Sequence, residues 1–217
     1  MRNFRHMARA YIVDYGVGNI GSLQNMYKRV TGQLPELTTD LSNLEPGDRL
    51  MLPGVGNFGY AMQRLNELDL ADPLRQLAQS GEVAMLGICL GAQLLLEGSE
   101  EAEEKGLGII PGQCRKFDRA ALPAELRIPH MGWTEVGCRN ADHPLAQGQN
   151  DETRFYFVHS FRMMPELPEH ALFTAHHGIE FCAGVCSNSV VGVQFHPEKS
   201  HRFGMQFLKS FANWEIQ

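Results

Sequence analysis

Cys89 lies in a segment whose residue types suit nucleophilic chemistry. The apolar run 83–88 is typical of a buried strand, and it leads through Gly87-Ile88-Cys89-Leu90-Gly91 directly into a helical pattern that begins at Gln93. A glycine on each side of the cysteine allows a sharp strand-to-helix turn, because a Cβ there would collide with neighbouring backbone. This pattern is that of a nucleophile elbow with sulfur in place of the usual serine oxygen. The segment also fits a buried core cysteine, so a base elsewhere in the chain must decide between the two.

Among the nine histidines, His196 has the context that a general base requires. The segment 190–195 is typical of a buried strand, and His196, Pro197 and Glu198 follow at its end. In open α/β sheets, ligands gather beyond the strand ends, near the edge where the elbow places Cys89. The proline fixes the local backbone, so Glu198 can accept a hydrogen bond from one imidazole nitrogen while the other faces the thiol. The tripeptide alone also fits a polar turn, but together with the elbow it has the form of a catalytic triad.

Two glycine-rich loops raise a competing hypothesis. Residues 16–21 and 54–59 both satisfy G-x-G-x-x-G, and Glu36 lies where a ribose-binding carboxylate would follow the first loop. Nicotinamide binding is therefore an alternative function. However, two matches in one short chain show how permissive the pattern is, and tight strand-to-helix turns are its more frequent meaning. Pro53 stiffens the strand exit before the second loop, whose backbone N–H groups could point into a pocket rather than at phosphates.

The other histidines do not predict a metal site. His130 and His159 end apolar runs and could line a pocket, whereas His176 and His177 are adjacent, so their side chains diverge. No Cys, His or carboxylate partner stands at the spacing of a zinc site. We therefore expect neither a metal ion nor another cofactor.

The composition is typical of a soluble globular protein. The chain has 217 residues, of which 43% are hydrophobic and 20% charged, and this length can bury a substantial core. A net charge of −6 without a basic run argues against a nucleic-acid partner, and no apolar stretch approaches membrane-spanning length. Five cysteines without a CxxC pair fit a reduced cytoplasm. Residues 1–9 lack the apolar region of a signal peptide and are expected to form a frayed extension.

The order of the predicted elements indicates an α/β fold. In the first half strands alternate with helices, which favours an open, mostly parallel sheet flanked by helices. Strands are expected at 10–15, 49–52 and 83–88, helices at 20–30, 60–68 and 72–80, and a solvated acidic segment at 97–104. Short strands between turn residues then predict an antiparallel β extension in the C-terminal half, at 113–117, 127–129, 133–136, 154–158, 171–175, 180–186 and 190–195, followed by a closing helix at 202–214. No linker divides residues 10–217, so one domain is expected.

Taken together, these motifs resemble the class I (triad) glutamine amidotransferases. Within that family the chain is similar to the glutaminase subunits of imidazole glycerol phosphate synthase, from about residue 10 to the C-terminus. The resemblance rests on seven segments in order: 14–19, 52–58, 87–91, 105–108, 128–133, 155–160 and 192–200. It implies that residues 10–217 form a type-1 glutamine amidotransferase domain with a flavodoxin-like sheet. It also implies hydrolysis of L-glutamine to glutamate and ammonia.

The resemblance also implies a role for each triad residue. Cys89 would attack the side-chain amide carbon, and His196 would accept the thiol proton and then protonate the leaving ammonia. Glu198 would hold His196 in the correct tautomer, and water activated by His196 would hydrolyse the thioester. The N–H groups of Leu90 and Val55 would bind the tetrahedral oxyanion, the second after a flip of the peptide that precedes it.

Further residues take their roles from the same resemblance. Substrate glutamine would be held by Gly54, Gln93, His159, Ser160 and Phe161, although Gln93 also fits an ordinary polar helix residue. Ammonia released into water becomes ammonium and loses its nucleophilicity, so the site must open onto a partner. The relatives dock on a (β/α)₈ barrel cyclase that passes ammonia through its core and makes imidazole glycerol phosphate and AICAR in histidine biosynthesis. Asn19, Tyr156 and Lys199 would lie near that heterodimer interface, or are plain surface residues.

Three departures from the family pattern leave the pathway open. Ala92 stands where relatives commonly have methionine, Thr134 where asparagine is usual, and Phe161 replaces a tyrosine. Because none of these touches the triad, glutaminase chemistry is still expected. The alternatives are a paralogous glutaminase that supplies ammonia for sugar amidination in surface-polysaccharide synthesis, and a non-catalytic docking module, against which the intact triad argues.

Overall fold

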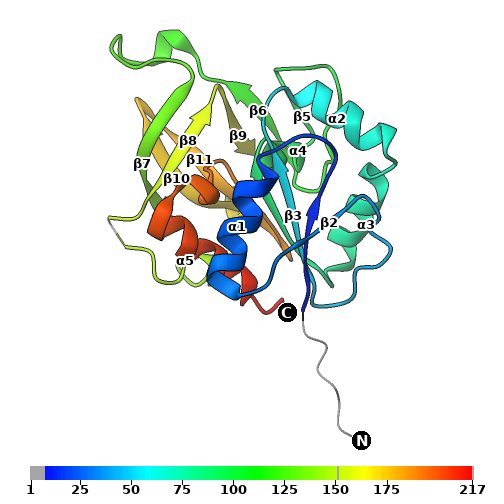
Figure 1. Ribbon diagram of the computed structural model, residues 1–217. Helices are drawn as coiled ribbons and strands as arrows, with labels where there is room; N and C mark the ends of the chain where they lie inside the picture. Colours follow the sequence, from blue (N-terminus) through cyan, green and yellow to red (C-terminus); the bar gives the residue numbers. More distant parts are fainter. Residues whose placement is uncertain (1–7, 151, 217) are drawn as a thin grey trace, which may run out of the picture.

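The computed structural model describes residues 8–150 and 152–216, so most of the extension expected at 1–9 lies outside the described residues. Within the described part, the chain folds into a twelve-stranded mixed sheet with helices on both faces (Figure 1). The main path of the sheet has the strand order β2-β1-β3-β4-β12-β11-β10-β7-β8. No helix in this part is long and apolar enough to cross a lipid bilayer.

The first half of the sheet is parallel. It consists of β1 (Ala10–Val13), β2 (Glu36–Thr38), β3 (Arg49–Gly54), β4 (Ala84–Cys89) and β12 (Val190–Val193). All of these strands except β2 are buried along their whole length. Their near-continuous apolar runs explain this, because such strands can be covered by helices on both faces. The exposed β2 lies at the sheet edge.

The second half of the sheet is antiparallel. β11 (Ile179–Ser187) pairs with β12 and is followed by β10 (Ala171–His177), β7 (His130–Cys138) and β8 (Arg154–His159). A side branch on β11 contains β9 (Phe161–Pro165), β6 (Gly112–Lys116) and β5 (Gly98–Ser99). The fold class expected from the sequence, a mostly parallel sheet with an antiparallel extension, is confirmed.

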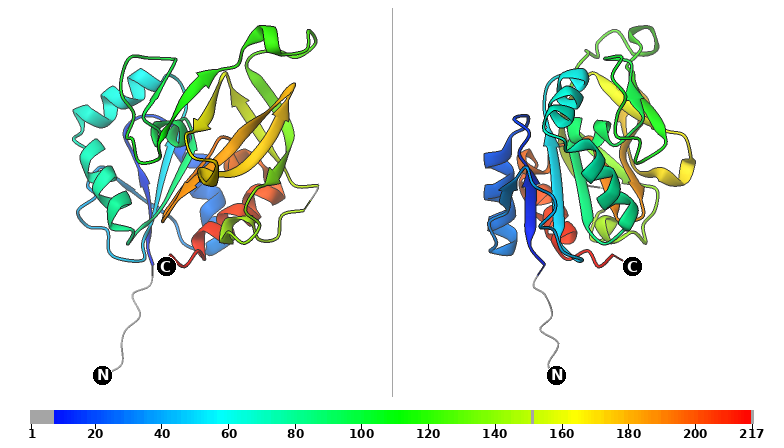
Figure 2. Two further views of the ribbon diagram at one scale, coloured as in Figure 1. Left: turned by 180° about the vertical axis from the view of Figure 1, so that it is seen from behind. Right: turned by 90° about the vertical axis from the view of Figure 1, so that its right-hand side faces the viewer.

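The helices divide between the two faces (Figure 2). α1 (Ile20–Thr31) and α5 (His201–Ala212) pack beside each other on one face, over a core that includes Leu23, Tyr27 and Phe207. α2 (Phe58–Glu67), α3 (Ala71–Ser80) and the short α4 (Leu90–Leu94) belong to the core of the other face. Single turns of 3₁₀ helix occur at η1 (Arg119–Ala121), η2 (Pro144–Ala146), η3 (Pro168–His170) and η4 (Pro197–Lys199).

A buried arginine fastens the end of α5 to the sheet. Arg49, the first residue of β3, is 7% exposed. Its Nε donates to the carbonyl oxygen of Phe211 at 3.2 Å, and its Nη2 donates to that of Trp214. Phe211 lies in the last turn of α5, whose carbonyl groups lack partners within the helix, and Trp214 lies two residues beyond its end. The guanidinium donates to both carbonyl groups and complements the negative end of the helix dipole.

Two sequence expectations need correction, and three strands are not predicted by the sequence. Residues 127–129 form no strand, and Pro129 has no N–H to donate to a neighbouring strand. The strands β2, β5 and β9 are not predicted, because short, partly polar strands give little periodic signal. The acidic segment 97–104 is not simply solvated, since Glu101 is half-buried and its Oε2 accepts from the N–H of Phe58 at 2.8 Å. A carboxylate at that position complements the positive N-terminus of α2.

Both glycine-rich loops are turns from a strand into a helix. The first connects β1 to α1, where Gly16 and Gly18 have φ of 82° and 131°. The second connects β3 to α2, where Gly56 has φ of 106°. Such positive φ values favour glycine, which explains the shared pattern without a phosphate ligand. Glu36, the residue considered for ribose binding, lies exposed in β2.

Candidate active site

Cys89 stands on the turn between β4 and α4. It has φ 54° and ψ −110°, a conformation that residues with a Cβ rarely adopt. A Cβ on Gly91 would lie 1.8 Å from the carbonyl oxygen of Leu52, and a Cβ on Gly87 would lie 2.7 Å from that of Gly91. The strand-to-helix turn predicted from the sequence is therefore present, and it tolerates no side chain at either flanking position.

His196 and Glu198 meet at the end of β12, the strand beside β4. His196 Nδ1 lies 2.8 Å from Glu198 Oε1, and the two side chains are 1% and 4% exposed. Because an ionised carboxylate only accepts, Nδ1 donates and the lone pair of the neutral ring is on Nε2. That Nε2 atom is buried and has no hydrogen bond within the described residues. It is thus available to a proton from a nearby thiol.

Opposing effects set the pKa of His196. Burial lowers this pKa, because it disfavours the charged imidazolium. Interactions with Cys89 and with Glu198 outweigh burial and raise the pKa to about 9. The surroundings therefore stabilise the imidazolium that forms when the ring accepts a proton from the sulfur.

Two glutamine side chains surround the thiol. The Nε2 atom of Gln194 lies 3.8 Å from Cys89 Sγ, and its Oε1 accepts from Gln93 Nε2 at 3.0 Å. Gln93 Nε2 also donates to the carbonyl oxygen of Phe161 at 3.1 Å. Gln93 is 5% exposed and Gln194 is completely buried. These bonds connect the elbow helix to β9 and to the end of β12, which fixes the wall of the site around the sulfur.

A cavity of about 540 Å³ opens at Cys89. Ten of the residues predicted for the site line it: Asn19, Val55, Cys89, Leu90, Gln93, His159, Ser160, Phe161, His196 and Lys199. They come from the ends of β4 and β8, the start of β9, the helix α4 and the loops that follow β1, β3, β8 and β12. Chain segments that are far apart in sequence thus meet beyond the strand ends, where open α/β sheets bind ligands.

Three predicted residues lie outside the cavity lining. Glu198 stands behind His196, and Gly54 is buried against the elbow, where an added Cβ would lie 2.8 Å from the Gly91 nitrogen. Tyr156 is half-buried on β8, and its carbonyl oxygen accepts from the N–H of His196 at 2.9 Å. Its ring lies 5.9 Å from Lys199 Nζ.

Two polar side chains of the site are not predicted by the sequence. The sequence predicts Gln194 only as part of the strand that leads to His196, and its pairing with Gln93 spans 101 positions. Glu101, the acidic residue among those that line the cavity, was assigned to a solvated stretch. A polar residue inside a buried-type strand was the available signal for Gln194. The local sequence around Glu101 contained no comparable signal.

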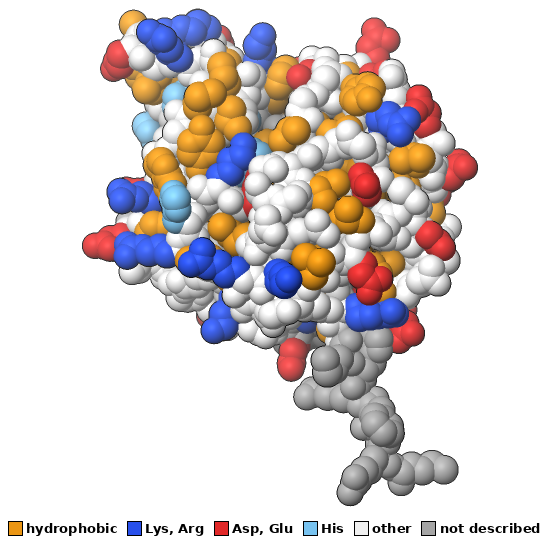
Figure 3. Space-filling model, in the orientation of Figure 1, with side chains coloured by type: hydrophobic (Ala, Val, Ile, Leu, Met, Phe, Trp, Pro, Cys, Tyr) orange, Lys and Arg blue, Asp and Glu red, His pale blue; other side chains and the backbone are white. Residues whose placement is uncertain are grey.

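The surface near β7 and β8 includes exposed apolar side chains. Met131 and Trp133, both on β7, are 62% and 43% exposed. Hydrophobic side chains gather on this side of the molecule, with histidines among them (Figure 3). Exposed apolar patches of this kind mark interaction sites.

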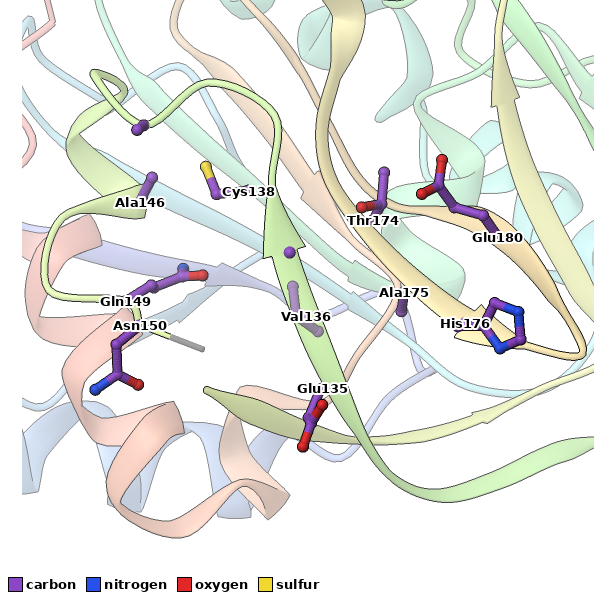
Figure 4. A pocket seen from close by; sticks show the side chains of 12 residues that line it. Glu135, Val136, Cys138, Ala146, Gln149, Asn150, Thr174, Ala175, His176 and Glu180 are labelled. Atoms are coloured by element: carbon purple, nitrogen blue, oxygen red, sulfur yellow. The ribbon is translucent and has the colours of Figure 1, made fainter. Parts of the chain in front are cut away.

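A second cavity of about 540 Å³ lies elsewhere, between β7, β10 and the segment 139–150 (Figure 4). Its wall includes Glu135, Thr174, His176 and Glu180. None of the residues predicted for catalysis or glutamine binding lines it. The predicted chemistry is therefore gathered at the Cys89 cavity alone.

Comparison with known proteins decides the family. The family model "Glutamine amidotransferase class-I" matches residues 11–213. The chain belongs to this family. It is 42% identical over 201 residues to imidazole glycerol phosphate synthase subunit HisH 2 of Pseudomonas aeruginosa, which covers 93% of the chain and 97% of that relative. The HisH subunit of Bdellovibrio bacteriovorus is also 42% identical, over 93% of the chain and 98% of the relative. The family resemblance found in the motifs is thereby confirmed.

Solved structures agree with the fold. A crystal structure of a glutamine amidotransferase superimposes with a TM-score of 0.70 at 18% identity, over 94% of this chain and 99% of that one. A chain of PurLQS from Thermotoga maritima gives a TM-score of 0.69 at 20% identity, over 95% and 98%. At such low identity these likenesses concern the architecture only.

Proposed function

We propose that this chain is the glutaminase subunit of an imidazole glycerol phosphate synthase and acts in histidine biosynthesis. The observation that carries the proposal is the buried His196–Glu198 pair with its free Nε2 atom beside the Cys89 elbow. The relatives at about 40% identity that are named as HisH subunits of this synthase support the pathway.

The geometry accounts for a complete acyl-transfer cycle. The Cys89 sulfur attacks the amide carbon of glutamine while its proton passes to His196 Nε2, and Glu198 holds the ring by its Nδ1 proton. The imidazolium then protonates the leaving nitrogen, so ammonia departs and a γ-glutamyl thioester remains. A water molecule that gives its proton to His196 attacks the thioester, which releases glutamate and restores the thiol.

Other lining residues complement the substrate. The Leu90 and Val55 N–H groups are our candidates for stabilising the oxyanion, and each such donor is typically worth about 10²–10³ in rate. The α-amino and α-carboxylate groups of glutamine carry opposite charges. Glu101 offers a carboxylate to the first, and backbone of the segment 159–161, with Gln93, forms the wall beside the second.

The apolar face at Met131 and Trp133 is where we place the partner. Ammonia needs a route that excludes water, and a (β/α)₈ barrel cyclase docked over the cavity mouth would provide it. Asn19 and Lys199 line the mouth, and Tyr156 lies under Lys199. These three residues are therefore proposed to contact the cyclase, and release of imidazole glycerol phosphate and AICAR would follow on its side.

The decisive experiment compares Cys89→Ala with the wild type in complex with the cyclase subunit. The variant should lose glutamine-dependent synthesis by at least about 10³-fold and keep synthesis from added ammonium salts, because only the nucleophile is missing. Cys114→Ala, which removes a buried cysteine outside the cavity lining, is the matched control. Retained glutamine hydrolysis in Cys89→Ala contradicts the assignment, and transfer of ammonia to a sugar acceptor alone would move the chain to polysaccharide synthesis.

A further inference from the structure

A chain of hydrogen bonds leads from β7 to the wall of the glutamine site. Thr134 Oγ1 lies 2.8 Å from His130 Nε2, and His130 Nδ1 lies 3.0 Å from His159 Nε2. His159 Nδ1 lies 2.7 Å from the carbonyl oxygen of Phe161, which also accepts from Gln93. The two histidines meet because they stand directly opposite each other in the β7–β8 pairing.

The direction of every bond in this chain follows from its last member. The Phe161 carbonyl can only accept, so His159 donates from Nδ1, and a neutral His159 ring then accepts at Nε2. His130 must then donate from Nδ1, which leaves its Nε2 to accept from the Thr134 hydroxyl. In their neutral state both rings therefore carry the proton on Nδ1.

The packing around the rings maintains this neutral state. His130 stacks on Phe157 and lies 4.3 Å from the His177 ring, centroid to centroid, and Phe181 contacts both His130 and His159. Burial lowers the pKa of His130 to about 4 and that of His159 to about 3. Neither ring is therefore protonated near neutral pH, and the hydrogen-bond chain keeps one orientation.

We propose that His130 and His159, oriented by the Thr134 hydroxyl, are positioning residues for glutamine: they fix the Phe161 carbonyl and, through it, the Gln93 amide. This inference rests on the proposed glutaminase function. Gln93 in turn holds Gln194 beside the Cys89 sulfur, so the network ends at the nucleophile. None of the three positioning side chains touches the reacting atoms. Loss of these hydrogen bonds therefore impairs the binding of glutamine more than the chemical step.

Thr134→Val tests this role in the complex with the cyclase, because valine keeps the shape and removes only the hydroxyl. We expect the KM for L-glutamine to rise about fivefold, which corresponds to about 1 kcal/mol for one neutral hydrogen bond, with kcat within about twofold and ammonium-dependent activity unchanged. Thr134→Ser restores the hydroxyl and should restore the KM. Thr174→Val is the matched control: it is a half-buried strand threonine whose side chain lines the separate cavity (Figure 4).

Nitrogen-15 NMR of the imidazole rings gives a second readout that does not depend on activity. Near neutral pH both His130 and His159 should be neutral with the proton on Nδ1, and Thr134→Val should perturb His130 more than His159. The inference is overturned if His159 carries its proton on Nε2. It is also overturned if Thr134→Val leaves the KM for glutamine unchanged while the wild type is active. A wild-type complex without any glutaminase activity instead overturns the proposed function, so the two failures are distinguishable.

Discussion

Gly91→Ala would place a methyl group where the elbow has no room for it. The added carbon would lie 1.8 Å from the Leu52 carbonyl oxygen, whereas close carbon–oxygen contacts are about 3.3 Å, so β3 or the elbow would have to move by about 1.5 Å. β3 cannot shift easily: Leu52 is paired with Gly87 of β4, and the neighbouring Pro53 carbonyl accepts from the Tyr15 hydroxyl at 2.7 Å. We expect a cost at or above the upper end of overpacking effects, about 3 kcal/mol.

At this chain length such a cost lowers Tm by about 6–12 °C, since each kcal/mol corresponds to about 2–4 °C. Displacement of Cys89 by about 1 Å should also reduce glutamine hydrolysis by about 10²-fold. Gly21→Ala in α1 is the control: apart from its chain neighbours and its own helix backbone, no atom lies within 4 Å of the added Cβ, and helix propensity should raise the stability by about 0.5–1 kcal/mol. Thermal unfolding followed by circular dichroism measures both variants. Wild-type Tm and activity in Gly91→Ala would refute the steric reasoning.

Two further predictions concern stability. Arg49→Met should lower the free energy of unfolding by about 2–3 kcal/mol, because the Phe211 and Trp214 carbonyl groups lose a charged donor. Arg64→Met, which breaks a surface pair with Glu67, should change the free energy of unfolding by at most about 0.5 kcal/mol. Equal effects of the two variants in urea titrations would contradict a stabilising role of the Arg49 hydrogen bonds. Because the pKa values of His130 and His159 are lowered in the folded protein, the unfolded protein binds more protons between about pH 6.5 and 4. The free energy of unfolding should therefore fall as the pH is lowered through that window, by up to about 1.4 kcal/mol per pH unit for each histidine. Urea unfolding from pH 7 to 5 tests this: His130→Phe should flatten the dependence, and an unchanged slope in that variant would exclude the histidine as its source.

The parallel half of the sheet could be predicted because its strands are continuous apolar runs bounded by turn residues. β4 and the helices α1 and α3 lie within a few residues of their expected ends. The antiparallel half was harder, because its pairing is set by tertiary contacts rather than by local pattern. Residues 127–129 have strand-like composition but lie outside the sheet, because tertiary contacts rather than composition decide which short apolar segments pair.

The triad candidates could be predicted because each has a local signal. Cys89 is flanked by glycines, and His196 follows a buried strand with a carboxylate two positions later. The Thr134–His130–His159 chain had no such signal, since it depends on the register of β7 against β8. A shift of one residue would send these side chains to opposite faces, and nothing in either segment alone specifies that register.

The position of β12 in the sheet has a consequence for synthesis of the protein. Val190 pairs with Met85, 105 positions earlier (190 − 85), so the edge of β4 remains open until the last strand has been made. A nascent chain thus carries its nucleophile long before it carries the base and the orienting carboxylate, and an interrupted chain cannot cleave glutamine. The same open edge would pair readily with other chains. Synthesis of β12 and of the residues that follow it, rather than synthesis of Cys89, is therefore the event that starts catalysis. The same event covers the edge of β4 that could pair with other chains.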